Sequence, residues 1–198
     1  MMNTVIYDFE TLSQDPIRGA AINLALVSYD ESRLSSDNPY GYEELLRETR
    51  YIKFDVAEQV EIYNRKIDPE TLSWWKSQPA EARVVLKPSD EDKSITELEQ
   101  FLFDNINFSA LKKAYTRGNT FDPILLRELL EAAGKKDPFP FWIVRDTRST
   151  IDGMAFGHKL KNSFIPEGLE EKFIAHDCRH DIVMDVMRMQ SLAQALRG

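Results

Sequence analysis

The chain has 198 residues, which is enough for one domain with a sizeable core. Its hydrophobic content of 42% is typical of globular proteins, and no apolar run is long enough to span a membrane. The net charge of −8 argues against passive coating of nucleic acid by a basic surface. The N-terminus lacks the pattern of a signal peptide, and a single cysteine, Cys178, fits a reducing compartment. These features predict a cytoplasmic protein without a membrane segment.

The first quarter of the chain predicts a hairpin followed by a polar region. Residues 3–10 and 21–29 are apolar runs of strand length. The turn-forming residues 13–19 between them predict that the two strands pair antiparallel. Residues 31–50 are polar, with Asp37-Asn38-Pro39 marking a loop, and residues 51–54 predict a short third strand.

The remainder alternates between helical spacing and short apolar runs. Pro69 lies at an early position of one helical stretch, where proline is well tolerated. The sequence predicts helices over 56–65, 69–77, 94–108, 123–133 and 178–196, and strands over 113–117 and 139–144. This order predicts an α/β fold, in which one mixed sheet is flanked by helices in a single domain over residues 1–198.

Two carboxylates close the first predicted strand. Asp8 and Glu10 are separated by one residue, and alternate residues of a strand project from the same face. Two carboxylates on one face repel each other unless a cation lies between them, and oxygen ligands of this kind suit Mg²⁺ or Mn²⁺. Taken alone, this pattern is more often a solvated turn, so the interpretation depends on the other acids of the chain.

Two further segments place acids at comparable positions. Asp122 follows the strand over 113–117, and His176 with Asp181 flank the beginning of the last helix. Ligands gather at strand ends and at the first turns of helices in α/β sheets, and a histidine there can act as a general base. Asp122 alone could equally be a helix-capping residue. His180 and Asp185 repeat the spacing of His176 and Asp181 one turn later, so the residues alone leave two versions of this segment open.

As a set, these segments resemble the DEDD superfamily of 3′–5′ exonucleases, and the histidine before the last aspartate resembles its DEDDh branch. Within that branch the chain resembles the phage-type exodeoxyribonucleases of T-even phages and a related bacterial exoribonuclease-like domain. The stretches that carry the resemblance run through the whole chain: Asp8-Phe9-Glu10-Thr11, Ile52-Lys53-Phe54-Asp55, residues 74–83, residues 88–92, Arg117-Gly118-Asn119-Thr120-Phe121-Asp122, Arg145-Asp146-Thr147-Arg148 and Ala175-His176-Asp177. One residue separates Asn119 from Phe121, where many proofreading exonucleases have two, and the phage type shares the shorter form.

The resemblance implies a ribonuclease-H-like fold and a role for each motif residue. Two Mg²⁺ or Mn²⁺ ions would be held by four carboxylates, and His176 would be the general base. The implied metal ligands are Asp8, Glu10, Asp122 and Asp181. Because the family histidine lies just before the last helix, the resemblance favours His176 and Asp181 over His180 and Asp185. Thr11, Asn119 and Arg148 are predicted to contact the substrate or to support its binding loop.

Several conspicuous residues have a structural interpretation beside a functional one. Trp74 and Trp75 could stack bases, but adjacent helical residues point in different directions, so at least one is predicted to be core. Arginines at 117, 145 and 148 could bind phosphate or form salt bridges within an acidic protein. Cys178 is predicted to pack within the last helix, and His158 to lie on the surface.

The predicted function is metal-dependent 3′–5′ hydrolysis of single-stranded nucleic acid from a free 3′ end. The phage-type resemblance favours DNA, and RNA stays open because nothing in the chain identifies a contact to the 2′ position. Two alternatives are a catalytically silent nucleic-acid-binding module and a phosphoesterase for small nucleotides. The sequence also leaves the oligomeric state open, a homodimer included.

Overall fold

Five strands form one mixed sheet in the computed structural model, which describes residues 2–156 and 159–197. The strands are β1 (Thr4–Thr11), β2 (Ala21–Tyr29), β3 (Arg50–Lys53), β4 (Lys113–Thr116) and β5 (Val144–Asp146). Their order across the sheet is β3-β2-β1-β4-β5. Strand β2 pairs antiparallel with both β1 and β3, and β4 pairs parallel with both β1 and β5. The predicted fold class is confirmed, and so is the antiparallel pairing of β1 with β2.

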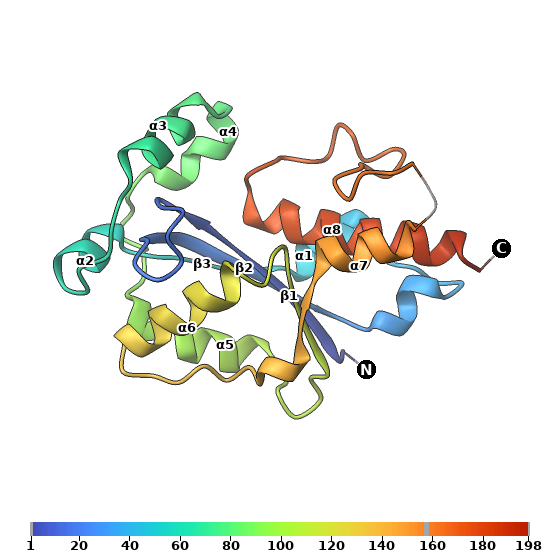
Figure 1. The fold of residues 1–198 in the computed structure, drawn as a ribbon, viewed down its shortest axis with the longest axis horizontal. Helices are drawn as coiled ribbons and strands as arrows, with labels where there is room; N and C mark the ends of the chain where they lie inside the picture. Colours follow the sequence, from blue (N-terminus) through green and yellow to red (C-terminus); the bar gives the residue numbers. More distant parts are fainter. Residues whose placement is uncertain (1, 157–158, 198) are drawn as a thin grey trace.

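Helices cover both faces of this sheet (Figure 1). One face carries α5 (Leu98–Asn105) and α6 (Asp122–Ala132), and the other carries α1 (Tyr42–Glu48), α7 (Thr147–Met154) and α8 (Cys178–Ala195). Side chains of β1 alternate between the two layers, as the pleat requires. Val5, Tyr7 and Phe9 lie in the core beneath α5 and α6, whereas Ile6 lies in the core beneath α8.

A third, smaller core lies beside the end of the β1–β2 hairpin. Here α2 (Val56–Glu61), α3 (Pro69–Ser77) and α4 (Ala80–Arg83) follow one another, and α3 and α4 form a separate lobe in Figure 1. Trp75 is 1% exposed and packs with Leu12, Ile22 and Ala82. Its indole N–H donates to the carbonyl of Thr11 at 2.8 Å, which fixes α3 against the end of β1. The prediction that one of the two tryptophans is core is therefore confirmed.

The structure departs from the sequence predictions at three places. The strand predicted over 139–144 is wrong, because Phe141–Ile143 form the 3₁₀ turn η4 and β5 begins only at Val144. Pro140 has no N–H to give to a ladder, and Trp142 is 64% exposed. The polar segment 31–50, in which only the loop at Asp37-Asn38-Pro39 was predicted, also contains the 3₁₀ turn η1 (Glu31–Ser35) and α1. The helix predicted over 56–65 ends at Glu61.

Other differences are smaller. The helix predicted over 94–108 is divided into the 3₁₀ turn η3 (Ile95–Glu97) and α5, and η2 (Val84–Leu86) and α7 had no predicted counterpart. Cys178 is buried in the α8 core and its Sγ lies 3.1 Å from Oδ1 of Asn23, as expected for a packing residue. No helix in the described ranges is long and apolar enough to cross a membrane. His158 lies outside the described residues.

Candidate functional site

Asp8 and Glu10 lie at the carboxyl end of β1. Strand pairing continues through both residues on the β2 side, with Asp8 opposite Ala25 and Glu10 opposite Asn23. They share the face of Ile6, which is the face covered by α8. The two carboxylates therefore project from one face of the sheet, as the one-residue spacing predicted, and this is the face that α8 covers.

Asp122 reaches the same strand from the opposite side. The ladder between β1 and β4 ends at the pair formed by Ile6 and Tyr115, which leaves the following part of β1 open on that side. Phe9 donates its backbone N–H to Oδ1 of Asp122 at 3.3 Å. Asp122 is the first residue of α6, and only 4% of this residue is exposed. Its position is thus fixed by a helix beginning and by a strand N–H that no neighbouring strand uses.

The third segment approaches from the loop before α8. His176 has a left-handed backbone with φ of 64°, an uncommon conformation for a residue with a side chain. Its backbone N–H donates to Oδ2 of Asp181 at 3.0 Å. Asp177 caps α8 by accepting the N–H of Arg179 at 3.0 Å. The cap and the hydrogen bond to Asp181 together hold the loop against the first turn of the helix.

Glu10, His176 and Asp181 come together as one group of metal-ligand type. Each offers one ligand atom, and these atoms lie within 4.8 Å of one another. The segments that carry them are separated by most of the chain, so the fold itself makes this group. It combines two oxygen donors with one imidazole nitrogen in the described part of the chain.

Asp8 and Asp122 extend the group into a wider field of negative charge. Burial raises the pKa of Asp8 well above its ordinary value, and the charges of Asp122, Glu10 and Asp181 raise it further. The pKa of Glu10 is also raised well above its ordinary value, by burial first and then by Asp181 and Asp122. These mutual effects place the four carboxylates in one electrostatic cluster.

The remaining titrating groups of the cluster respond to the same environment. Burial raises the pKa of Asp122 to about 7, although the Phe9 N–H and the charge of Arg148 act in the opposite direction. Burial and the charge of Asp185 raise the pKa of Asp181 to about 7. Burial lowers the pKa of His176, which favours the neutral imidazole. The site therefore holds more negative charge than its described neighbours neutralise, beside a histidine able to accept a proton.

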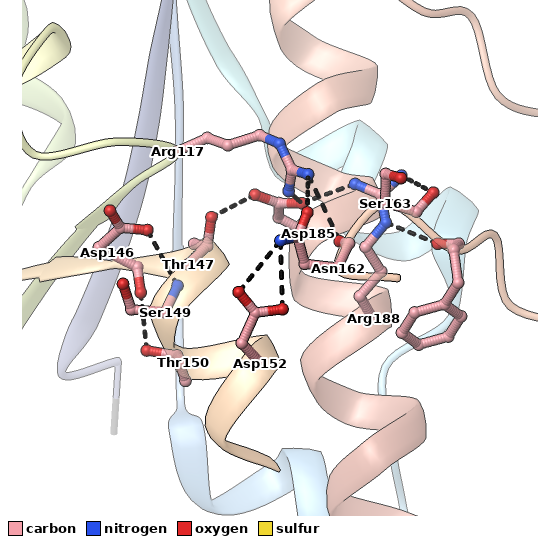
Figure 2. Close-up of polar contacts among 11 residues, drawn as sticks. Arg117, Asp146, Thr147, Ser149, Thr150, Asp152, Asn162, Ser163, Asp185 and Arg188 are labelled. Carbon is pink, nitrogen blue, oxygen red and sulfur yellow. Dashed lines mark hydrogen bonds and ion pairs between the residues drawn. The ribbon is translucent and has the colours of Figure 1, made fainter. Parts of the chain in front are cut away.

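The competing pair, His180 and Asp185, has a different environment. Figure 2 shows Asp185 between the guanidinium groups of Arg117 and Arg188, with the hydroxyl of Thr147 on its other oxygen. The two ion pairs measure 2.6 and 2.7 Å, and the carboxylate is only 1% exposed. His180 lies with its Nδ1 2.7 Å from the hydroxyl of Tyr42. Both members of this pair thus have structural partners of their own.

The predicted substrate residues lie at the margins of the cluster. The Thr11 hydroxyl donates to the carbonyl of Ser13 at 2.8 Å. Asn119 is exposed and its Oδ1 accepts the Thr116 hydroxyl at 3.3 Å, which closes the loop before Asp122. Arg148 is exposed, and a Cβ added to Gly118 would lie 3.4 Å from its Nη1. The three predicted residues therefore lie beside the end of β1 and the beginning of α6, the segments that carry Glu10 and Asp122.

A groove of about 280 Å³ opens directly beside Glu10. It lies between the end of β1, one face of α3 and the loop before α6. Its walls are formed by Glu10, Thr11, Ser13, Gln14, Glu70, Thr71, Trp74 and Phe121. This groove borders one of the four carboxylates and is large enough to receive part of a nucleotide.

Sequence reasoning missed most of the α3 wall of this groove. Glu70, Thr71 and Trp74 lie on one face of the helix because residues three and four positions apart are neighbours there. The spacing was visible in the sequence, but nothing in it indicated that this face would turn toward Glu10. Phe121 was part of a recognised motif, and its adjacency to Asp122 was the available signal.

Comparison with known proteins gives a family and a relative for nearly the whole chain. The sequence profile of a family described as the 3′–5′ exoribonuclease Rv2179c-like domain matches residues 3–184. The exodeoxyribonuclease of Enterobacteria phage T4 is 31% identical over 202 residues, a match that covers 93% of this chain and 86% of the phage protein.

Solved structures of exonuclease I share the fold. The enzyme from Methylocaldum szegediense is 16% identical with a TM-score of 0.59, and the match covers 98% of this chain and 42% of that one. E. coli exonuclease I in complex with a dT13 oligonucleotide is 14% identical with a TM-score of 0.57, covering 100% of this chain and 41% of that one. The chain thus spans about two fifths of the length of the exonuclease I chains that it matches.

Proposed function

The chain belongs to the 3′–5′ exoribonuclease Rv2179c-like domain family, a family of 3′–5′ exonucleases, and on that premise we propose a metal-dependent mechanism for it. In this proposal residues 1–198 act as one exonuclease domain that removes nucleotides from the 3′ end of a single strand. The main support for this proposal is that ligand atoms of Glu10, His176 and Asp181 lie within 4.8 Å of one another. The same electrostatic cluster also contains Asp8 and Asp122.

The donor set fits hard divalent cations. All four proposed ligands, which are Asp8, Glu10, Asp122 and Asp181, offer carboxylate oxygens, the donors that Mg²⁺ and Mn²⁺ prefer. Their pKa values are raised by burial and by one another's charge. Positive charge placed among them would relieve this repulsion, which is the physical reason for expecting cations here. A pair of divalent ions supplies charge neutralisation at the phosphate and lowers the pKa of water.

The residues of the chain then have distinct tasks. The four carboxylates hold the ions on a rigid platform of one strand and two helix beginnings. Burial lowers the pKa of His176, so its imidazole is neutral at pH 7. It accepts a proton from the water molecule whose oxygen attacks the phosphorus. Thr11 contacts the terminal nucleotide from the groove, Asn119 supports the loop before Asp122, and the exposed Arg148 faces the phosphate.

We infer that single-stranded DNA is the preferred substrate. The T4 relative is named an exodeoxyribonuclease, and it matches this chain over nearly its whole length. The family is named for an exoribonuclease activity, so RNA is the second candidate. A cytoplasmic location stays a prediction from the sequence, and the sequence leaves the assembly state open.

Two other functions would use the same fold differently. A silent binding module would retain strands without shortening them, and a small-nucleotide phosphoesterase would act on mononucleotides. Labelled mononucleotides and labelled single-stranded oligonucleotides, each incubated with Mn²⁺, separate the three. The proposal expects oligonucleotides to be shortened and mononucleotides to be left intact. Binding without shortening would favour the first alternative, and release of phosphate from mononucleotides the second.

A further inference from the structure

The imidazole of His176 has a single ring neighbour among the described residues, and that neighbour is Trp74. Their ring centroids lie 4.8 Å apart at an interplanar angle of 83°, an edge-to-face contact. The hydrogen bond of His176 to Asp181 uses the backbone N–H, and no hydrogen bond of the imidazole itself is formed within the described part of the chain. The backbone of the proposed base is thus fixed by Asp181, whereas its ring is contacted by an indole from α3.

Trp74 is linked to the end of β1 through its neighbour Trp75. It contacts the buried Trp75 edge-to-face, with centroids 5.2 Å apart at 75°. Trp75 is in turn bound to the Thr11 carbonyl at the end of β1. The position of the Trp74 ring therefore follows the position of the strand that carries Glu10, although 42% of Trp74 is exposed.

We propose that Trp74 is a positioning residue for His176, an inference that rests on the proposed function. The loop before α8 holds the backbone of His176 in a left-handed conformation, and within the described residues no hydrogen bond of the imidazole opposes rotation of its ring. The indole limits that rotation and keeps the imidazole beside Glu10 and Asp181. Trp74 acts through His176 and does not itself exchange a proton.

The kinetic constants distinguish this positioning role from a second possible role of Trp74, in which it forms a wall of the groove and stacks on a base. A wall contributes to binding, so its loss raises KM. A positioning residue orients a group that is used in the transition state, so its loss lowers kcat and leaves KM nearly unchanged. Because Trp74 contacts His176 and also lines the groove, kinetic measurements are needed to tell the two roles apart.

The kinetic experiment compares Trp74→Leu, Trp74→Phe and Trp142→Leu in steady-state hydrolysis of an oligonucleotide. Trp142 is also exposed, but it precedes β5 and so lies at the opposite end of the parallel strands from Glu10. We expect Trp74→Leu to lower kcat on the order of 10- to 100-fold, the usual cost of a misplaced reacting group. Trp74→Phe retains an aromatic ring, so its kcat should be close to that of the wild type. The kcat of Trp142→Leu should equal that of the wild type.

A double variant tests whether the effect passes through the histidine. If Trp74 acts only by orienting His176, the Trp74→Leu/His176→Ala double variant should be no slower than His176→Ala alone. A further loss equal to that of Trp74→Leu would overturn the inference, because Trp74 would then act independently of the base. A raised KM with unchanged kcat in Trp74→Leu would overturn it as well.

A measurement without substrate or metal completes the test. The chain has three histidines, so the imidazole C–H signals in a ¹H–¹³C spectrum are few, and loss in His176→Ala identifies those of His176. We expect these signals to shift in Trp74→Leu and to stay in place in Trp142→Leu, and unchanged signals in Trp74→Leu would contradict the contact. Failure of the proposed function is recognised separately, by a wild-type chain that shortens no oligonucleotide.

Discussion

The backbone N–H of His176 donates a hydrogen bond to Oδ2 of Asp181 at 3.0 Å, which ties the proposed base to one of the proposed ligands. The carboxylate belongs to the first turn of α8, and the histidine to the loop before it. Any change that moves the beginning of this helix will therefore move both groups together. This coupling explains why a loop residue can have the defined position that proton transfer requires.

Replacing the two candidate histidines should give very different results. His176→Ala should lower the hydrolysis rate by roughly 10²–10⁴, the usual contribution of a positioned general base. His180→Ala should lower it far less, since the His180 imidazole is engaged by the Tyr42 hydroxyl at 2.7 Å. Steady-state rates with a saturating oligonucleotide measure both. If His180→Ala proved the more damaging change, the last motif would move to His180 and Asp185.

Removing one proposed ligand should separate activity from stability. Asp122→Asn keeps an oxygen for the Phe9 N–H but removes a charge from a site where burial raises the pKa of this carboxyl to about 7. Hydrolysis should be lost, while the melting temperature in EDTA at pH 8 should hold or rise. Asp37→Asn, which removes an equal charge at a side chain 95% exposed, should change neither quantity appreciably. Metal-dependent activity in Asp122→Asn would contradict the assignment of Asp122 as a metal ligand.

The same substitution at Asp185 should have the opposite effect on stability. Asp185→Asn leaves the guanidinium groups of Arg117 and Arg188 without their anion in a buried site. Breaking a buried ion pair by removing one partner costs about 3–5 kcal/mol of the free energy of unfolding. Chemical denaturation of the metal-free protein measures this quantity. A variant as stable as the wild type would show that these contacts contribute little.

The metal-free protein should become more stable as the pH falls from 8 to 5. The folded-state pKa values of Asp122 and Asp181 are raised to about 7 by burial, above those of exposed carboxyls. The folded state therefore binds more protons than the unfolded state in this window, and stability is lost as the pH rises through 7. Thermal melts in EDTA across this range check the sign. A melting temperature that rose with pH would contradict the raised pKa values, and Asp122→Asn should flatten the slope.

The sequence predicted best those elements whose pattern is local. The hairpin of β1 and β2 and the beginning of α3 at Pro69 are set by apolar runs, turn residues and proline geometry. By contrast, α1 buries only Tyr42 and Leu45, and α7 buries only Thr147 and Ile151. So few buried positions leave almost no periodic signal. The run over 139–144 misled because Phe141 and Trp142 are apolar yet exposed.

The candidate site divides in a similar way. The spacing of Asp8 and Glu10 determines their common face, so this part could be predicted from the strand alone. Asp181 and Asp185 cannot be told apart by spacing, since both follow a histidine at the same distance. Their difference lies in partners from distant segments, above all Arg117, which pairs with Asp185. The contact of Trp74 with His176 likewise depends on how α3 packs against the end of β1.

The central claim is that the carboxylate cluster uses divalent metal to shorten a single strand from its 3′ end. The most direct measurement follows a 5′-labelled oligonucleotide, as DNA and as RNA, on a gel with Mg²⁺, Mn²⁺ or Ca²⁺, beside a closed circular strand. We predict a ladder that shortens from the 3′ end with Mg²⁺ or Mn²⁺, no comparable turnover with Ca²⁺, whose looser coordination spoils alignment, and an intact circle. Cleavage of the circle, or shortening that persists in EDTA, would contradict the account.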